Sequence, residues 1–261
     1  TKEIINAAVK ANKLKLIIRG GVGLDNIDVE YAERNGIAVK NTPNASDVSV
    51  AELVIGHILN MARFLHNSNI TMRQGQWNKK IYQGIEIEGK TLGIIGFGRI
   101  GRQLAKKANA LGMKIKFYDI ICPVIKNMEY IYCDMDELLA TSDFVSLHVP
   151  HNKGEKTVIG KDEIQKMKDG AYLINCARGG VVDEEALLEA LNTGKLQGAA
   201  MDVFVDEPNP NAALCNHDKV SITPHIGAST KEAQWKIGQE IKEIILGFWE
   251  RSCLNDQAKT I

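Results

Sequence analysis

Short apolar runs alternate with amphipathic segments along most of the chain. The runs are rich in Val, Ile and Leu and predict buried strands, whereas the segments between them carry apolar residues at the helical spacing. The strands are expected at residues 14–18, 37–39, 91–95, 113–119, 130–133, 144–149, 172–175, 199–204 and 220–223. The helices are expected at residues 3–9, 29–34, 47–66, 102–108, 135–140, 161–167, 184–192 and 231–249. This alternation predicts an α/β fold with a doubly wound parallel sheet, whose ligands bind at the carboxyl ends of the strands.

Three glycines stand at the spacing G-x-G-x-x-G between a predicted strand and a predicted helix. Gly96 allows a tight turn, Gly98 lets the backbone approach a pyrophosphate, and Gly101 lets the helix pack against the strand. The N-terminus of the following helix attracts the charge of the phosphates. A dinucleotide site of the Rossmann type is therefore predicted here.

An acidic residue ends the next predicted strand. Asp119 lies 18 residues after Gly101, close to the separation of ~20 that is usual in dinucleotide-binding units. Its carboxylate can accept hydrogen bonds from the adenosine ribose and would repel a 2′-phosphate, which favours NAD over NADP. Glycine triplets also occur in ordinary turns, and an acid at a strand end is often only solvated. The strand, helix and acid in register favour the cofactor site.

Three further strand ends carry residues suited to hydride-transfer chemistry. Arg178 can grip a carboxylate with its planar fork, and His225 can accept or donate a proton near neutral pH. A carboxylate such as that of Glu207 can fix the tautomer of the imidazole. Each residue alone is better explained by a helix cap, an exposed turn or a satisfied backbone carbonyl. Together, after a nucleotide fingerprint, they predict an active site.

The remaining histidines give weaker signals. His148 ends the strand expected at 144–149, where a contact to the ribose or adenine and a structural role are equally open. The other four, His57, His66, His151 and His217, carry no spacing argument and are interpreted as structural or solvated.

The composition of the chain narrows the range of binding partners that can be expected. The chain has 32 basic and 32 acidic residues, so nothing in its charge favours nucleic acid or a membrane surface. Small molecules and further copies of the chain are the expected partners. The five cysteines are scattered and odd in number, which argues against a disulfide framework and a zinc site and favours a cytoplasmic location. No apolar run approaches the ~20 residues of a membrane span, and no metal site is predicted.

Several motifs together resemble those of the D-isomer-specific 2-hydroxy acid dehydrogenases, most closely their phosphoglycerate dehydrogenase branch. The matching stretches are residues 19–28, 49–52, 96–101, 175–183, 202–208 and 224–233. The resemblance implies NAD-dependent oxidation of 3-phospho-D-glycerate to 3-phosphohydroxypyruvate, the first step of serine synthesis. It places the catalytic arginine, glutamate and histidine of the family on Arg178, Glu207 and His225. Reduction of glyoxylate or hydroxypyruvate is the alternative within this chemistry, and an NADH-sensing scaffold like the C-terminal binding corepressors is the alternative outside it.

The resemblance also implies contacts to the ligands. The cofactor contacts are expected from Val22, Gly96, Gly98, Arg99, Ile100, Gly101, Asp119, Val149, Cys176, Ala177, Asp202, Gly227 and Ala228. The substrate contacts are expected from Arg19, Gly20, Gly21 and Val22, with Arg19 at the phosphate.

Two domains are expected from the same resemblance. Residues 42–230 would form the cofactor domain, and residues 1–41 with the returning helix in 231–261 would form part of a smaller, flavodoxin-like substrate domain. Family members carry additional residues before the position of Thr1, so the N-terminal part of that domain is expected to be missing. The apolar surface of the helix at 47–66 predicts a homodimer interface.

Overall fold

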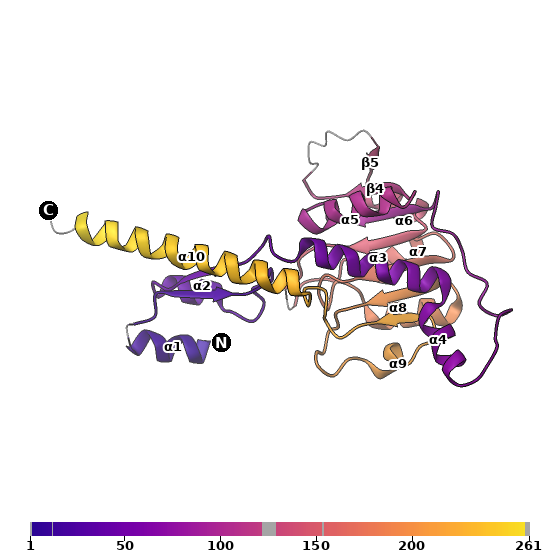
Figure 1. Ribbon diagram of the computed structural model, residues 1–261, viewed down its shortest axis with the longest axis horizontal. Coiled ribbons are helices and arrows are strands. Elements are labelled where there is room, and N and C mark those ends of the chain that lie inside the picture. Colours follow the sequence, from indigo (N-terminus) through magenta and orange to yellow (C-terminus); the bar gives the residue numbers. More distant parts are fainter. Residues whose placement is uncertain (1, 12, 122–128, 153, 259–261) are drawn as a thin grey trace. The chain divides into compact units, whose positions relative to one another are not determined.

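A seven-stranded parallel sheet is the centre of the larger part of the molecule (Figure 1). The computed structural model describes residues 2–11, 13–121, 129–152 and 154–258, with side chains described as far as residue 250. Within these ranges the chain divides into two compact units, residues 50–227 and residues 1–49 with 228–261. The sequence places the borders after residues 41 and 230. A hydrogen bond of 2.8 Å between the hydroxyls of Ser49 and Thr230 joins the two border segments within the smaller unit.

The sheet lies in the larger unit and has the strand order β5-β4-β3-β6-β7-β8-β9 in the described residues. Its strands are β3 (Thr91–Ile95), β4 (Lys114–Tyr118), β5 (Tyr130–Tyr132), β6 (Phe144–Leu147), β7 (Ala171–Asn175), β8 (Leu196–Met201) and β9 (Val220–Ile222). All neighbouring pairs are parallel, so the carboxyl ends of these strands share one edge. The direction of winding reverses between β3 and β6, which is where such sheets bind ligands. The doubly wound α/β fold is confirmed.

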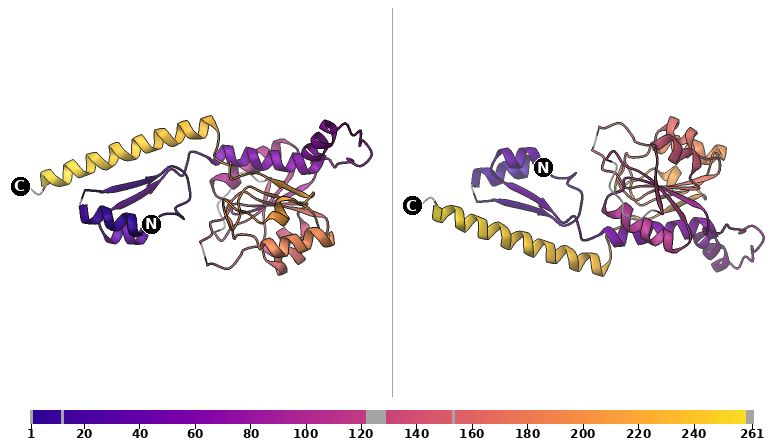
Figure 2. Two further views of the ribbon diagram at one scale, coloured as in Figure 1. Left: turned by 90° about the horizontal axis from the view of Figure 1, so that it is seen from below. Right: turned by 90° about the horizontal axis from the view of Figure 1, so that it is seen from above.

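Alternation along the strands builds a core on each face of the sheet. Leu92 and Ile94 of β3 face a cluster that includes α3 (Asp47–Arg63) and α5 (Arg99–Ala110), whereas Ile95 faces the opposite cluster. That second cluster contains residues of α6 (Met135–Thr141), α7 (Lys161–Lys166), α8 (Glu184–Thr193) and α9 (Ala212–Cys215). Figure 2 shows helices on both sides of the sheet. The sequence pattern did not predict the short helix α9.

The helix predicted at 47–66 is broken into two. α3 ends at Arg63, Phe64 takes a left-handed conformation with φ 53°, and α4 (Leu65–Arg73) continues at a bend of 62°. The Asn60 side-chain oxygen accepts the N–H of His66 at 2.8 Å, and the Phe64 ring lies 5.9 Å from that of Tyr82. These contacts hold a backbone conformation that a bulky residue rarely adopts.

The apolar residues of α3 are mostly buried against their own sheet. Val54, Ile58 and Ala62 are at most 1% exposed and pack on the face that also receives α5. Most of the apolar surface on which the dimer prediction rested is therefore internal, whereas Leu53 and Leu59 are partly exposed. Exposed apolar side chains occur instead on α4 and the segment after it, namely Leu65, Ile70, Met72, Trp77 and Ile81.

No single helix of the described residues is long and apolar enough to span a bilayer. The helices α3 and α4 reach that length and apolarity only together, across their bend of 62°.

The smaller unit contains a pair of parallel strands. β1 (Leu16–Arg19) pairs with β2 (Ala38–Asn41), and α1 (Lys2–Ala11) and α2 (Val29–Arg34) contribute to a small core around Ile5 and Ala32. α10 (Lys231–Ala258) belongs to the same unit and extends beyond the predicted end at residue 249. A side chain at Gly20 would come within 3.0 Å of Ile237 on α10, so the loop after β1 lies directly on this helix.

Candidate active site

The glycine loop between β3 and α5 is shaped by the chain's own backbone. Gly96 has φ 91°, and a Cβ there would collide with the carbonyl oxygen of His148. A Cβ on Gly101 would collide with the carbonyl oxygen of Gly96. A Cβ on Gly98 would meet no atom of the described residues within 4 Å. Gly96 and Gly101 are therefore required by packing, whereas Gly98 faces open space at the N-terminus of α5, where a phosphate can approach closely.

Asp119 fastens the end of β4 to this loop. Its Oδ2 accepts the N–H of Phe97 at 2.7 Å, and its Oδ1 accepts the N–H of Ile121 at 3.2 Å. Each carboxylate oxygen has a second lone pair, so Asp119 can still accept hydrogen bonds from the two ribose hydroxyls. The open space at Gly98 and the acceptor at Asp119 fit the pyrophosphate and ribose of a dinucleotide.

His225 and Glu207 are in direct contact. The Nδ1 atom of His225 lies 2.7 Å from Oε2 of Glu207, and Oε1 of Glu207 accepts the N–H of Phe204 at 3.0 Å. The two side chains are 47% and 36% exposed, so solvent and substrate can reach them. With Nδ1 turned to the carboxylate, Nε2 is the nitrogen that can face a substrate hydroxyl.

Asp202 holds the segment that carries His225. This carboxylate is 1% exposed; Oδ1 accepts the Thr223 hydroxyl at 2.6 Å and the N–H of Ile226 at 2.9 Å, and Oδ2 accepts the N–H of Gly227 at 2.9 Å. His225 itself has φ 52°, in the left-handed region. Three hydrogen bonds to one buried acid thus stabilise the strained turn that presents the imidazole.

Arg178 follows β7, next to the strand that leads to Glu207. Asn175, the last residue of β7, closes the turn by donating to the Arg178 carbonyl at 2.9 Å and accepting the Ala177 N–H at 3.0 Å. A Cβ on Gly179 would collide with the carbonyl oxygen of Phe204. The loop bearing Arg178 therefore packs tightly on the loop bearing Glu207.

Comparison with known proteins agrees with this geometry. The family model for "D-isomer specific 2-hydroxyacid dehydrogenase, NAD binding domain" matches residues 55–227, about two thirds of the chain. The chain belongs to the D-isomer specific 2-hydroxyacid dehydrogenase family. Its cofactor is NAD, and the open space at Gly98 together with Asp119 provides the fit.

Relatives within the family carry several names. The chain is 45% identical to D-3-phosphoglycerate dehydrogenase of Methanocaldococcus jannaschii over 98% of the chain and 49% of the relative. It is 48% identical to hydroxypyruvate reductase of Thermotoga maritima over 94% of the chain and 80% of the relative. The structure of D-lactate dehydrogenase from Aquifex aeolicus, complexed with NAD and lactic acid, matches with a TM-score of 0.85 and 35% identity over 96% of this chain and 80% of that one. The chain thus spans about half the length of the phosphoglycerate relative.

Several of the other cofactor contacts expected for this family lie around the same strand ends. Val149 is adjacent to the glycine loop, because a Cβ on Gly96 would come within 2.9 Å of its side chain. Arg99 and Ile100 form the first turn of α5. Burial, reinforced by the charge of Asp202, raises the pKa of the Cys176 thiol well above its usual range, so this thiol stays protonated and unreactive.

The substrate residues expected for the family lie in the smaller unit. Nη1 of Arg19 donates to the Gly20 carbonyl at 3.3 Å, and the guanidinium covers the face of Gly21, where a Cβ would collide with it. Val22 is 38% exposed, and its carbonyl accepts the Asn41 side-chain amide at 2.6 Å. Ala228, one of the expected cofactor contacts, also belongs to the smaller unit.

Two histidines that gave no spacing signal lie beside the site. His57 is buried on α3 and contacts the end of β9, with Nδ1 at 2.8 Å from the Ser221 hydroxyl and Nε2 at 3.2 Å from the Thr223 hydroxyl. His151 covers Gly180 in the arginine loop, where a Cβ would come within 2.7 Å of its ring. The helical period of α3 could have indicated that His57 is buried, but not which residues it contacts.

The structure also bears on the predictions about cysteines and metal sites. Cys133, Cys176 and Cys215 are free thiols, whereas Cys122 and the side chain of Cys253 lie outside the described residues. Among the residues that the structure describes, no group of three or more His, Cys, Asp or Glu side chains could hold a metal ion.

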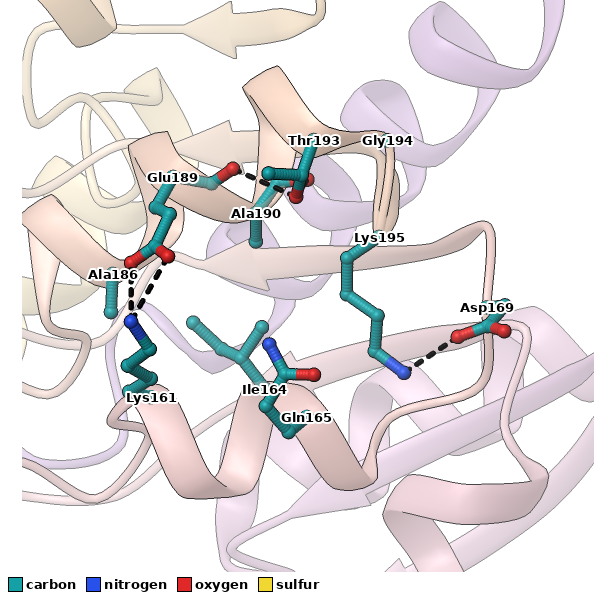
Figure 3. Close-up of a pocket in the computed structure, with 10 residues that line it drawn as sticks. All are labelled: Lys161, Ile164, Gln165, Asp169, Ala186, Glu189, Ala190, Thr193, Gly194 and Lys195. Atoms are coloured by element: carbon teal, nitrogen blue, oxygen red, sulfur yellow. Dashed lines mark hydrogen bonds and ion pairs between the residues drawn. The ribbon is translucent and has the colours of Figure 1, made fainter.

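A cavity of about 460 Å³ lies away from these strand ends, between α7 and α8 (Figure 3). It includes Gly194 and Lys195, which lead into the start of β8, whereas the predicted site residues follow the ends of strands. Its two lysines are paired, Lys161 with Glu189 at 2.8 Å and Lys195 with Asp169 at 2.7 Å. None of the predicted site residues lines this cavity.

We expect His148 to make the stability of the larger unit dependent on pH. Its Nε2 lies 2.9 Å from the Ser146 hydroxyl, its buried Nδ1 has no hydrogen-bond partner among the described residues, and burial lowers its pKa to about 4. Between pH 6.5 and 4 the unfolded chain binds a proton that the folded chain does not, so acidification lowers the free energy of unfolding by about 1.4 kcal/mol per pH unit. From pH 7 to pH 5, we expect the wild type to lose about 2 kcal/mol more than His148→Gln in urea unfolding.

The exposed His66 supplies the control for this measurement. The variant His66→Gln should follow the wild-type pH dependence, because it removes an exposed histidine and leaves His148 with its buried Nδ1 in place. Parallel pH profiles for the wild type and His148→Gln would show that His148 does not stay neutral in the folded protein.

Proposed function

We propose that the chain is an NAD-dependent D-2-hydroxyacid dehydrogenase whose preferred substrate is 3-phospho-D-glycerate. The observation that carries this proposal is the 2.7 Å contact between His225 and Glu207, beyond the same edge of the sheet as the glycine loop. An imidazole oriented by a carboxylate is the arrangement that proton transfer to or from a hydroxyl requires.

The proposed reaction divides one hydride and one proton between two acceptors. Bound NAD supplies the acceptor for the hydride that leaves C2 of the hydroxy acid. The Nε2 atom of His225 accepts the hydroxyl proton, so the C–O bond gains double-bond character as the C–H bond breaks. Glu207 holds the proton on Nδ1 and stabilises the imidazolium that forms. In the reverse direction, the imidazolium returns its proton to the carbonyl oxygen.

Arg178 is the proposed binding group for the substrate carboxylate. Its guanidinium offers a planar fork that can contact the carboxylate and the neighbouring C2 oxygen together. The tight packing of Gly179 on Phe204 supports this role, because it fixes the arginine loop against the loop of Glu207. Such fixed positioning is what an efficient transition state needs.

The phosphate preference rests on Arg19 and on the relatives. A proposed contact between Arg19 and the substrate phosphate would favour phosphorylated over unphosphorylated acids. The 45% identity to the D-3-phosphoglycerate dehydrogenase of Methanocaldococcus jannaschii supports the same substrate. Reduction of hydroxypyruvate is the second candidate, because the hydroxypyruvate reductase of Thermotoga maritima is 48% identical.

A substrate panel with an arginine variant tests this proposal. We expect wild-type kcat/KM to be highest for 3-phosphoglycerate among phosphoglycerate, glycerate and lactate, with hydroxypyruvate and glyoxylate as reverse substrates. Arg19→Ala should lower kcat/KM for phosphoglycerate by roughly 10–100-fold and that for glycerate far less, because a charge-assisted contact to phosphate is lost. The measurement is the initial rate at which NADH is formed from each hydroxy acid, or consumed with each keto acid, followed by its absorbance.

Arg34→Ala provides the matched control, since Arg34 lies in the same unit and is exposed on α2, paired with Glu30. This variant should leave kcat/KM unchanged for both phosphoglycerate and glycerate. Equal losses on both substrates in Arg19→Ala would remove the phosphate role. No turnover of any acid on the panel would contradict the enzyme and favour an NADH-binding scaffold.

We further propose that the protein acts as a homodimer in the cytoplasm. The exposed apolar side chains of α4 and the following segment support a dimer, and Trp77 at 79% exposed is the most accessible of them. The free thiols of Cys133, Cys176 and Cys215 are consistent with a reducing compartment.

A further inference from the structure

We propose that His57 is a positioning residue for His225, acting through Thr223 and Asp202. This inference rests on the proposed function for its catalytic consequence, but not for its structural one. His57 lies on α3, far in sequence from the loop that carries His225, and all four residues belong to the larger unit.

A continuous chain of hydrogen bonds crosses from α3 to the site. The Asn60 amide donates to the Ser221 hydroxyl at 2.7 Å, and that hydroxyl lies 2.8 Å from Nδ1 of His57. Nε2 of His57 lies 3.2 Å from the Thr223 hydroxyl, which donates to Oδ1 of Asp202 at 2.6 Å. The same Asp202 carboxylate accepts the two amides that follow His225 in sequence, those of residues 226 and 227.

The direction of every bond in this chain is determined by its two ends. Oδ1 of Asp202 accepts the proton of the Thr223 hydroxyl, so this hydroxyl has no second proton to donate and can only accept from His57. Nε2 of His57 must therefore carry the proton. In the neutral ring Nδ1 then accepts the Ser221 proton, and the Ser221 oxygen accepts from Asn60, which is the only direction the amide N–H allows.

Burial keeps His57 in this neutral form. Removal from water lowers the pKa of His57, and this effect exceeds the opposing attraction of the charge on Asp202. A neutral ring with its proton on Nε2 gives the Thr223 hydroxyl a donor on one side and the Asp202 carboxylate on the other. The hydroxyl is therefore held in one orientation.

The consequence is a fixed turn at His225. His225 has φ 52°, a conformation that persists only where surrounding bonds determine it. If Thr223 loses its donor, its hydroxyl can rotate away from Asp202, and the bonds from Asp202 to the amides of Ile226 and Gly227 weaken. The imidazole would then spend less time facing the substrate hydroxyl.

Substitution of His57 separates positioning from general stability. We expect His57→Leu to lower kcat by about tenfold while the Kd for NAD stays within about twofold, because the glycine loop is untouched. His57→Gln, whose side-chain N–H can replace the Nε2 donor, should recover most of kcat. The control is Asn67→Ala, which removes a 3.1 Å bond from α4 to the Asp218 carbonyl just before β9, at the end of that strand opposite to the site. It should lower Tm without changing kcat.

Amide hydrogen exchange provides a readout independent of activity. In His57→Leu, the amides of Ile226 and Gly227 should exchange roughly tenfold faster than in wild type, whereas Asn67→Ala should leave them protected. The ¹⁵N spectrum of wild-type His57 should show the neutral ring with its proton on Nε2 near pH 7. This measurement uses the wild type alone, so it does not depend on whether any variant folds.

These measurements keep the two proposals distinguishable. A wild type that oxidises no 2-hydroxy acid contradicts the proposed function, while hydrogen exchange still decides the role of His57. An active wild type together with unchanged kcat and unchanged exchange in His57→Leu overturns the His57 inference. A proton on Nδ1 instead of Nε2 in the wild type overturns it as well.

Discussion

His225→Ala should lower kcat for hydroxy-acid oxidation by roughly 10²–10⁴ and leave NAD affinity within a factor of about three. The methyl group can neither accept the hydroxyl proton nor pair with Glu207, whose carboxylate now lies 2.7 Å from the imidazole. Cofactor binding should be spared, because the glycine loop and Asp119 make no contact that depends on the imidazole ring. Steady-state kinetics and fluorescence titration with NADH measure the two quantities.

Two further variants complete this experiment. Glu207→Gln can still accept a hydrogen bond but cannot stabilise an imidazolium, so its loss in kcat should be smaller than that of His225→Ala and should vary with pH. His66→Ala, which removes an exposed histidine on α4, should behave as wild type. Turnover that survives in His225→Ala would assign the proton transfer to another group.

Gly98→Ala should weaken cofactor binding without loss of stability, whereas Gly101→Ala should lower the stability of the fold. A methyl group on Gly98 meets no atom of the described residues within 4 Å, so the fold should tolerate it, while the close approach of a pyrophosphate is blocked. We expect at least roughly a tenfold loss of NAD affinity with Tm nearly unchanged. A methyl group on Gly101 collides with the carbonyl oxygen of Gly96, which is fixed backbone, so Gly101→Ala should lose about 1–3 kcal/mol of unfolding free energy.

Thermal unfolding and NADH titration of both variants provide the comparison. The prediction fails for Gly98 if its alanine variant binds NADH like the wild type. It fails for Gly101 if Tm is unchanged, because the short contact with Gly96 would then be easily relieved.

Most elements of the larger unit could be predicted because they carry a local signal. The strands alternate apolar residues toward two faces, and the helices begin at residues that satisfy their first turn, such as Asp134 and Asp183. The strand predicted at 199–204 extends too far, because Val203 and Phe204 are apolar and buried but lie beyond the ladder that ends at Met201. Apolarity indicates burial there, and burial alone does not distinguish a strand from a packed loop.

The break after α3 had no signal in the sequence. A left-handed phenylalanine is unfavourable by itself, so the break at Phe64 depends on tertiary contacts with Tyr82 and on the bond from Asn60 to His66. Those contacts exist only in the folded chain and leave no local pattern around Phe64. The exposed apolar side chains were predicted on one long helix, but they lie on α4, beyond this break.

The candidate site could be predicted only in part for a similar reason. Parallel strands bring their carboxyl ends to one edge, so three polar residues at strand ends were enough to predict Arg178, Glu207 and His225 as neighbours. The supporting role of Asp202, which was expected only as a cofactor contact, and that of His57 gave no such signal. Asp202 and His57 act through bonds to Thr223, whose position opposite both of them follows from the pairing of β8 with β9 and the packing of α3.

The bond from Asp119 to the glycine loop has a consequence for the rate of cofactor exchange. Because the turn around Phe97 is held by a carboxylate from the adjacent strand and by contacts within the backbone, its shape is set before any dinucleotide arrives. Little chain entropy is then lost on association, so capture can proceed without a slow folding step in this loop. Residence time on the protein should accordingly depend on how many hydrogen bonds the ligand forms and not on reopening of the turn.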